Sequence, residues 1–232
     1  MSHINRIFRN IYIHIPKTAG RNMERHDFIR GSGHLSLQQL SQDDNFDESY
    51  IKWTFVRNPH ERLISAFFYV NKKWLTDFYK IIFNKNIEDE WEPVYSNKFR
   101  LPQYHSPVKE FYNFVNNLYE YKDNFFEAIK NPPFDGFASY FIHFYPMYYF
   151  VEHETVELDF IGRFENIQED WLTVKDMIRD NIRSPRSKKL ITNAALGNAP
   201  KGVVSIPENF NDPEIIKKIQ EIFKKDYEFF SY

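Results

Sequence analysis

The sequence predicts an α/β protein with a central, mainly parallel sheet. Three short apolar runs rich in β-branched or aromatic residues have the pattern of buried strands, at residues 11–15, 51–56 and 158–161. Each run is followed by polar residues and then by a segment with helical periodicity. Strands that alternate with helices are typical of a parallel sheet, because parallel neighbours need a crossover connection.

The first strand is expected at Ile11–Ile15 and the first helix at Gly20–Arg30, with a break at Gly31–Gly33. The polar segment Gln42–Glu48 is expected to be a loop. The second strand is expected at Ile51–Val56.

A strong helix start follows the second strand. Asn58 can cap the helix, Pro59 suits its first position and Glu61 places a carboxylate in its first turn. His60 is expected to be an exposed first-turn residue. The apolar face of this helix consists of Leu63, Ile64, Phe67 and Phe68.

The rest of the chain continues the alternation. Leu158–Ile161 is the third strand candidate, ended by Gly162, and the polar, basic segment Arg183–Gly202 is expected to be a long loop. Further helices are expected at 74–83, 108–118, 124–130 and 167–178, and from Pro213 onward.

Length and composition predict a single domain over residues 1–232, and the segment 84–149 is expected to be an insertion between core elements. The net charge of −2 argues against a nucleic-acid-coating protein. There is no cysteine, which excludes disulfides and thiolate metal sites. No apolar run is long enough for a membrane span, and Met1–Asn10 lacks the apolar core of a signal peptide, so a cytoplasmic location is expected.

The turn after the first strand has the composition of an anion site. It reads Pro16-Lys17-Thr18-Ala19-Gly20, in which Lys17 supplies a charge, Thr18 a hydroxyl, and the small residues a close backbone approach. A strand that leads into a helix N-terminus adds free N–H groups and the helix dipole. The turn is not a Walker A loop, because no glycine precedes Lys17 at the required spacing.

The turn after the second strand carries a second candidate anion site. Arg57 follows the strand directly, and its guanidinium can bind a phosphate through two hydrogen bonds. Ser65 shares a helix face with Arg62, which is either a ligand group or a structural ion-pair partner. Two such turns in one small domain suggest a ligand with two separated anionic groups.

These segments resemble the sulfotransferases that depend on 3′-phosphoadenosine 5′-phosphosulfate (PAPS), and most closely their carbohydrate branch with heparan sulfate 2-O-sulfotransferase and the chondroitin/HNK-1-type enzymes. His14–Gly20 resembles the 5′-phosphosulfate loop and Phe55–Phe67 the 3′-phosphate site. Two later segments also fit, Ile161–Trp171 with its Gly-Arg-Phe-Glu-Asn stretch and the C-terminal Asp226–Tyr232. The resemblance implies a P-loop NTPase-like, three-layer α/β fold.

The resemblance also implies a donor site. PAPS would be held by Arg57, Ser65 and the first loop, with Lys17 also neutralising the leaving group. Arg21 and Asn22 stand where the family has a hydroxyl residue, and Arg21 can replace it electrostatically. A basic segment that closes over the adenosine and 3′-phosphate in the family corresponds here to Arg186, Lys188, Lys189 and Lys201.

His34 is the implied catalytic base, because Gly33-His34-Leu35-Ser36 resembles the Gly-His-Val/Leu-Ser segment of the 2-O-sulfotransferase branch. His14 is expected to be structural, and His105 and His143 are the alternative bases. No metal is expected. The acceptor would be a small molecule or an oligosaccharide, bound by the segment 84–149, and the oligomeric state is left open.

Two other functions compete with this one. A P-loop kinase or other nucleotide phosphotransferase is disfavoured by the missing Walker glycines and by Arg57, which stands where a Mg²⁺ enzyme needs an acid. A non-catalytic nucleotide- or glycan-binding protein that kept the fold but lost activity is the other alternative, and its best support is the altered pair Arg21 and Asn22.

Overall fold

The computed structural model describes residues 3–23, 29, 33–70, 72–86, 107–193 and 208–232. Its contacts divide the chain into two compact units. The sheet unit comprises residues 1–58 and 146–205, and the helical unit comprises 59–145 and 206–232. The sequence-based prediction of one domain with an insertion at 84–149 stays a prediction, and residues 87–106 of that insertion lie outside the described residues.

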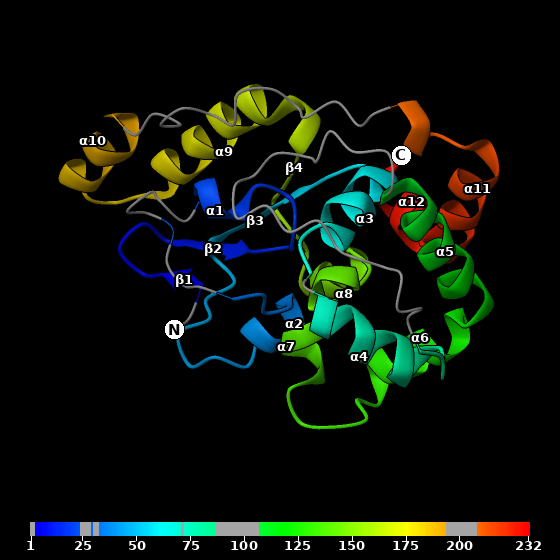
Figure 1. The fold of residues 1–232 in the computed structure, drawn as a ribbon. Coiled ribbons are helices and arrows are strands. Elements are labelled where there is room, and N and C mark those ends of the chain that lie inside the picture. Colours follow the sequence, from blue (N-terminus) through cyan, green and yellow to red (C-terminus); the bar gives the residue numbers. More distant parts are fainter. Residues whose placement is uncertain (1–2, 24–28, 30–32, 71, 87–106, 194–207) are drawn as a thin grey trace. The chain divides into compact units, whose positions relative to one another are not determined.

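The sheet unit contains four described strands in the order β1-β2-β3-β4 (Figure 1). The strands are β1 (Ile4–Asn5), β2 (Asn10–Ile13), β3 (Ile51–Val56) and β4 (Phe160–Arg163). β1 pairs with β2 antiparallel, whereas β2–β3 and β3–β4 are parallel, with Ile13 opposite Thr54 and Val56 opposite Arg163. The predicted α/β class and mainly parallel sheet are therefore confirmed.

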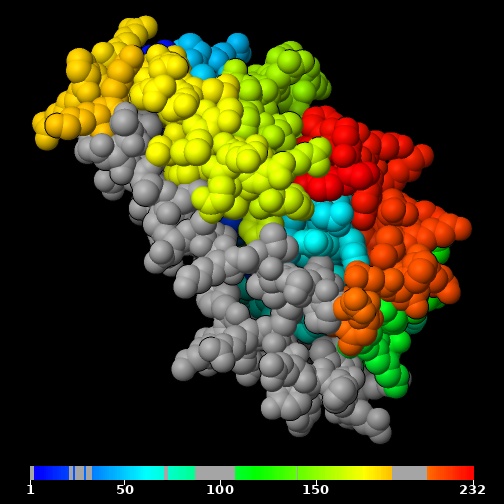
Figure 2. All heavy atoms as spheres, turned by 90° about the horizontal axis from the view of Figure 1, so that it is seen from above, coloured from blue at the N-terminus to red at the C-terminus, as the bar shows by residue number. Residues whose placement is uncertain are grey.

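The helices of the sheet unit are α1 (Gly20–Met23), α2 (Leu37–Leu40), α8 (Tyr148–Val151), α9 (Ile167–Asn181) and α10 (Pro185–Asn193). α9 packs on β3 and β4, and α10 lies beside α9 (Figure 2). The expected apolar stripe of α9 is buried in one cluster with Tyr12, Trp53 and Phe55. Trp53 lies at the centre of this cluster, 4.4 Å from Tyr12 and 6.1 Å from Trp171 between ring centroids.

The helical unit contains α3 (Pro59–Phe67), α4 (Lys72–Ile82), α5 (Pro107–Glu120), α6 (Lys122–Lys130), α7 (Phe137–Phe141), α11 (Pro213–Ile222) and α12 (Lys224–Phe230). α3 begins at Pro59 with Glu61 in its first turn, as expected. The core of this unit combines many phenylalanine rings with buried leucine, isoleucine and valine side chains. Its buried rings include Phe67, Phe78, Phe83, Phe111, Phe114, Phe125, Phe141 and Phe144.

Two local expectations were wrong. The segment from Pro185 to Asn193 is the helix α10 and not a loop. Pro185 occupies the first helical position, and the Ser184 hydroxyl lies 3.5 Å from the Ser187 N–H that it would cap. Gly162 does not end the third strand but lies inside β4. It faces Phe55 across the sheet, and a Cβ there would lie 2.6 Å from the Phe55 ring.

The expectation of an exposed His60 was also wrong. His60 is 7% exposed, and its Nε2 donates to the Phe210 carbonyl at 3.2 Å. The phenol of Tyr227 also bonds to the His60 backbone, and burial raises the pKa of that phenol to about 12. The C-terminal part of the chain therefore covers the first turn of α3, which the local sequence around His60 does not reveal.

We expect Gly162→Ala to destabilise the fold. The new methyl group must displace the Phe55 ring, and overpacking of this kind costs about 1–3 kcal/mol. The free energy of unfolding in urea would measure the loss. Ile161→Ala on the same strand is the control, because its side chain is 38% exposed and its truncation should cost less. Equal stability of wild type and Gly162→Ala would contradict the packing described.

His60 should make stability depend on pH. Burial lowers the pKa of His60 below its ordinary value of 6.5, against the opposing effects of Phe210 and Glu61. The unfolded chain therefore binds a proton more readily, and stability is lost as the pH falls below 6.5. We expect His60→Gln to reduce this loss, measured by urea unfolding at several pH values. An unchanged pH slope would contradict the buried, neutral state.

Candidate active site

The first loop, Pro16–Gly20, follows β2 and has an unusual backbone. Lys17 and Ala19 have positive φ angles of 70° and 75°. For residues with a Cβ this conformation costs roughly 1–2 kcal/mol each. Turns that include left-handed residues form concavities of N–H groups that bind anions. The strained backbone is therefore consistent with a loop shaped for an anionic ligand.

The side chains of the first loop divide into two groups. Lys17 and Ala19 are partly exposed, whereas Pro16, Thr18 and Gly20 are buried. The Thr18 hydroxyl, expected to donate to a ligand, donates instead to the Ile15 carbonyl at 2.8 Å and so holds the turn. Lys17 is thus the side chain of this loop best placed to meet a ligand. The side chains of Arg21 and Asn22 lie outside the described part of the structure.

Gly20 has a packing requirement that composition alone did not reveal. A Cβ on Gly20 would lie 1.7 Å from Nε2 of His14. His14 follows β2 directly and is only 6% exposed. The imidazole of His14 therefore occupies the space that any side chain at position 20 would need.

His34 lies against the same residue. Its Nδ1 is 3.0 Å from the His14 carbonyl oxygen, and the two imidazole centroids are 4.3 Å apart. Because a carbonyl only accepts, Nδ1 must carry the proton of the neutral ring, which leaves the lone pair on Nε2. An imidazole held in this tautomer can accept a proton from a substrate through Nε2.

The chain after His34 is anchored by the start of α2. The Ser36 hydroxyl accepts from the Gln39 N–H at 3.2 Å, and the Gln39 side chain accepts from the Ser36 N–H at 2.8 Å. This reciprocal capping box fixes the chain two residues beyond His34. α2 packs in turn on α8.

The second loop, Arg57–Asn58, follows β3 and contacts the turn Phe164–Asn166 after β4. Arg57 is 8% exposed, and its guanidinium carbon lies 4.5 Å from the centre of the Phe164 ring. The Asn58 N–H donates to a Glu165 carboxylate oxygen at 2.7 Å. Two segments that the sequence linked only through a resemblance are thus in contact, and Arg57 is held by cation–π stacking.

The structure also decides the role of Arg62. This residue, in α3 of the helical unit, is 1% exposed and donates to the carbonyls of His143 and Tyr145. Arg62 therefore has a structural role and links α3 to the segment 143–145 of the same unit. Ser65 lies one turn further along α3 and is partly exposed.

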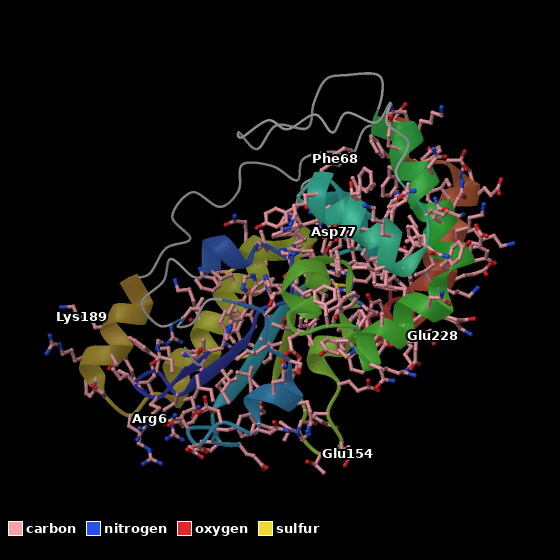
Figure 3. All side chains as sticks on the ribbon, turned by 60° about the horizontal axis from the view of Figure 1, so that its bottom comes forward. Arg6, Phe68, Asp77, Glu154, Lys189 and Glu228 are labelled. Atoms are coloured by element: carbon pink, nitrogen blue, oxygen red, sulfur yellow. The ribbon has the colours of Figure 1, made fainter. Side chains whose placement is uncertain are left out.

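The basic residues predicted to cover the donor lie mostly on α10. Arg186 and Lys189 are exposed and Lys188 is partly buried, and Lys189 projects from the helix into solvent (Figure 3). Lys201 lies outside the described residues, as does the alternative base His105. The other alternative, His143, is 9% exposed, and its ring centroid lies 4.4 Å from that of Tyr69.

The described residues contain no group of three or more histidine or acidic side chains arranged to hold a metal ion. None of the helices they form combines the length and the apolar character needed to cross a membrane.

Comparison with known proteins supplies the family. Neither the curated proteins nor the solved structures gave a significant match. A family model described as "Sulfotransferase family" matches residues 5–232. The match includes both loops, His34 and the C-terminal segment that covers α3. The chain therefore belongs to the sulfotransferase family, as an enzyme that uses PAPS.

Proposed function

We propose that this protein transfers the sulfuryl group of PAPS to a hydroxyl of a carbohydrate, with His34 as the general base. The observation that carries the proposal is the hydrogen bond between His34 Nδ1 and the His14 carbonyl. It joins the candidate base to the residue that ends β2 and packs against Gly20 of the first loop. The candidate base and the donor loop are thus connected through His14.

The proposed chemistry is an in-line displacement at sulfur. Nε2 of His34 accepts the proton of the acceptor hydroxyl, while that oxygen forms a bond to sulfur. The bond between sulfur and the bridging oxygen breaks, and its electron pair leaves with the 5′-phosphate of adenosine 3′,5′-bisphosphate. Lys17 and the N–H groups of the first loop stabilise the negative charge that develops there. In this proposal protein cations suffice, and no metal takes part.

The second loop would hold the remote end of the donor. Arg57 would bind the 3′-phosphate, and its stacking on Phe164 fixes the guanidinium before the ligand arrives. The assignment of Ser65 to the 3′-phosphate rests on the resemblance of Phe55–Phe67 alone. Arg21, Asn22, Arg186, Lys188 and Lys201 complete the proposed donor-binding set.

The carbohydrate acceptor is inferred from the resemblance of the first loop, the second loop and the His34 segment to the carbohydrate branch. The acceptor would be bound by residues from 84–149.

Donor binding can be tested by thermal shift. Adenosine 3′,5′-bisphosphate without metal should raise the melting temperature, because a ligand present at about 100 times its Kd stabilises by roughly 2.7 kcal/mol. Arg57→Ala should lose most of this shift. Arg179→Ala is the matched control, since Arg179 pairs with Asp176 and Asp180 on the surface of α9. A shift with Mg-ATP and none with the bisphosphate would overturn the donor assignment.

Catalysis can be tested with labelled PAPS and a panel of hydroxyl acceptors. Losing a general base costs about 10²–10⁴-fold, so His34→Ala should lose nearly all transfer. Lys17→Ala should lose on the order of 10²–10³-fold in kcat by removing a charge that stabilises the leaving group.

The exposed lysine variant Lys224→Ala is the control for these measurements. Full activity in His34→Ala would move the base to His105 or His143. A wild-type protein that binds the bisphosphate but transfers nothing to any acceptor would be a non-catalytic relative.

A further inference from the structure

We propose that the imidazole of His14 is a positioning residue, which holds the base His34 and the first loop in a fixed relation to each other. The inference rests on the proposed function, because it assigns His14 a role through His34. His14 itself does not exchange a proton with the substrate in this account. His14 holds the two groups in place, and the contacts through which it does so lie within the sheet unit.

One side of His14 meets the base. The two ring centroids are 4.3 Å apart at an angle of 59°, and the His14 carbonyl accepts the hydrogen bond that the His34 Nδ1–H donates. The main-chain bond selects the tautomer of His34. The ring contact restricts rotation about that bond, so together they give the Nε2 lone pair a direction.

Another side of His14 meets the first loop. Its Nε2 lies where a Cβ of Gly20 would be, at 1.7 Å from the ideal position. Gly20 follows directly on the strained residue Ala19. The same ring therefore supports the loop that would bind the reacting sulfate and the residue that would deprotonate the acceptor.

The ring is itself backed by the core. Tyr12 stacks on His14 with centroids 5.6 Å apart and an angle of 17°, and Trp53 stacks on Tyr12. His3 lies 6.4 Å from His14 across the β1–β2 pair. Because Tyr12 and Trp53 belong to the buried cluster under α9, His14 rests on close-packed and poorly compressible structure.

Replacing His14 by alanine should leave the main-chain hydrogen bond available but remove the imidazole ring that packs against His34. The His34 ring should then turn more freely. We expect kcat at saturating PAPS to fall by about 10- to 100-fold, since a misplacement of about 1 Å can cost 10²-fold. A purely structural role would lower the melting temperature without altering the protonation pattern of His34.

The decisive measurement is long-range ¹H–¹⁵N NMR of the histidine side chains in the ligand-free, full-length protein. The signals of His34 are assigned with His34→Gln. Wild type should carry the neutral His34 proton on Nδ1, and His14→Ala should show a mixture with the Nε2–H form. His153→Gln is the matched control. That histidine lies in the same unit with its Nε2 bonded to Ser41, and its loss should leave the His34 signals and kcat unchanged.

The outcomes separate this inference from the proposed function. An unaltered tautomer and kcat in His14→Ala, or a wild-type His34 protonated on Nε2, overturns the inference even where His34→Ala is inactive. An altered tautomer in a protein without sulfuryl transfer overturns the proposed function and leaves the contact intact. Should His14→Ala fail to fold, the milder His14→Gln takes its place in both measurements.

Discussion

The parallel pairing of β2, β3 and β4 is the constraint on which the candidate site depends. Parallel neighbours place their carboxyl ends at one edge of the sheet, and the register sets Ile13 opposite Thr54 and Val56 opposite Arg163. The first loop, the second loop and the turn Phe164–Asn166 leave the sheet at that edge. Ligands of open α/β sheets bind at such an edge. Segments far apart in sequence thus meet because three short strands pair in one direction.

Two glycines show how closely this edge is joined to the core. At Gly20 the missing side chain is replaced by the His14 ring, and at Gly162 by the Phe55 ring. In both places an aromatic ring of one segment covers a bare backbone of another, which is a common use of glycine within or beside a strand. The loops are therefore supported by packed rings in addition to backbone hydrogen bonds.

The elements predicted correctly from the sequence are those that neighbouring residues specify. β3 and the start of α3 follow from an apolar run and from Asn58-Pro59, since strand periodicity and helix capping act over a few residues. The two-residue strand β1 was missed because it depends on pairing with β2. α10 was missed although Ser184-Pro185 is a helix start, because its basic composition suggested a loop.

Two features near the loops were not predicted from the sequence. His60 is buried because Phe210, 150 residues further along the chain, packs against it, and no local pattern encodes that contact. The contact of His14 with Gly20 depends on the backbone path of the first loop, which the residue types alone do not specify. The family resemblance selected His34, but only the structure shows the hydrogen bond to the His14 carbonyl from which its tautomer is inferred.

Three of the groups proposed for the chemistry lie in one compact unit. Lys17, His34 and Arg57 all belong to the sheet unit, whereas Ser65 and residues 84–145 of the proposed acceptor segment belong to the helical unit. The geometry between the proposed base and the proposed leaving-group cation is therefore an internal property of the sheet unit. In the proposed function, substitutions within residues 84–145 would change the acceptor and leave the contacts among His34, His14 and the first loop intact.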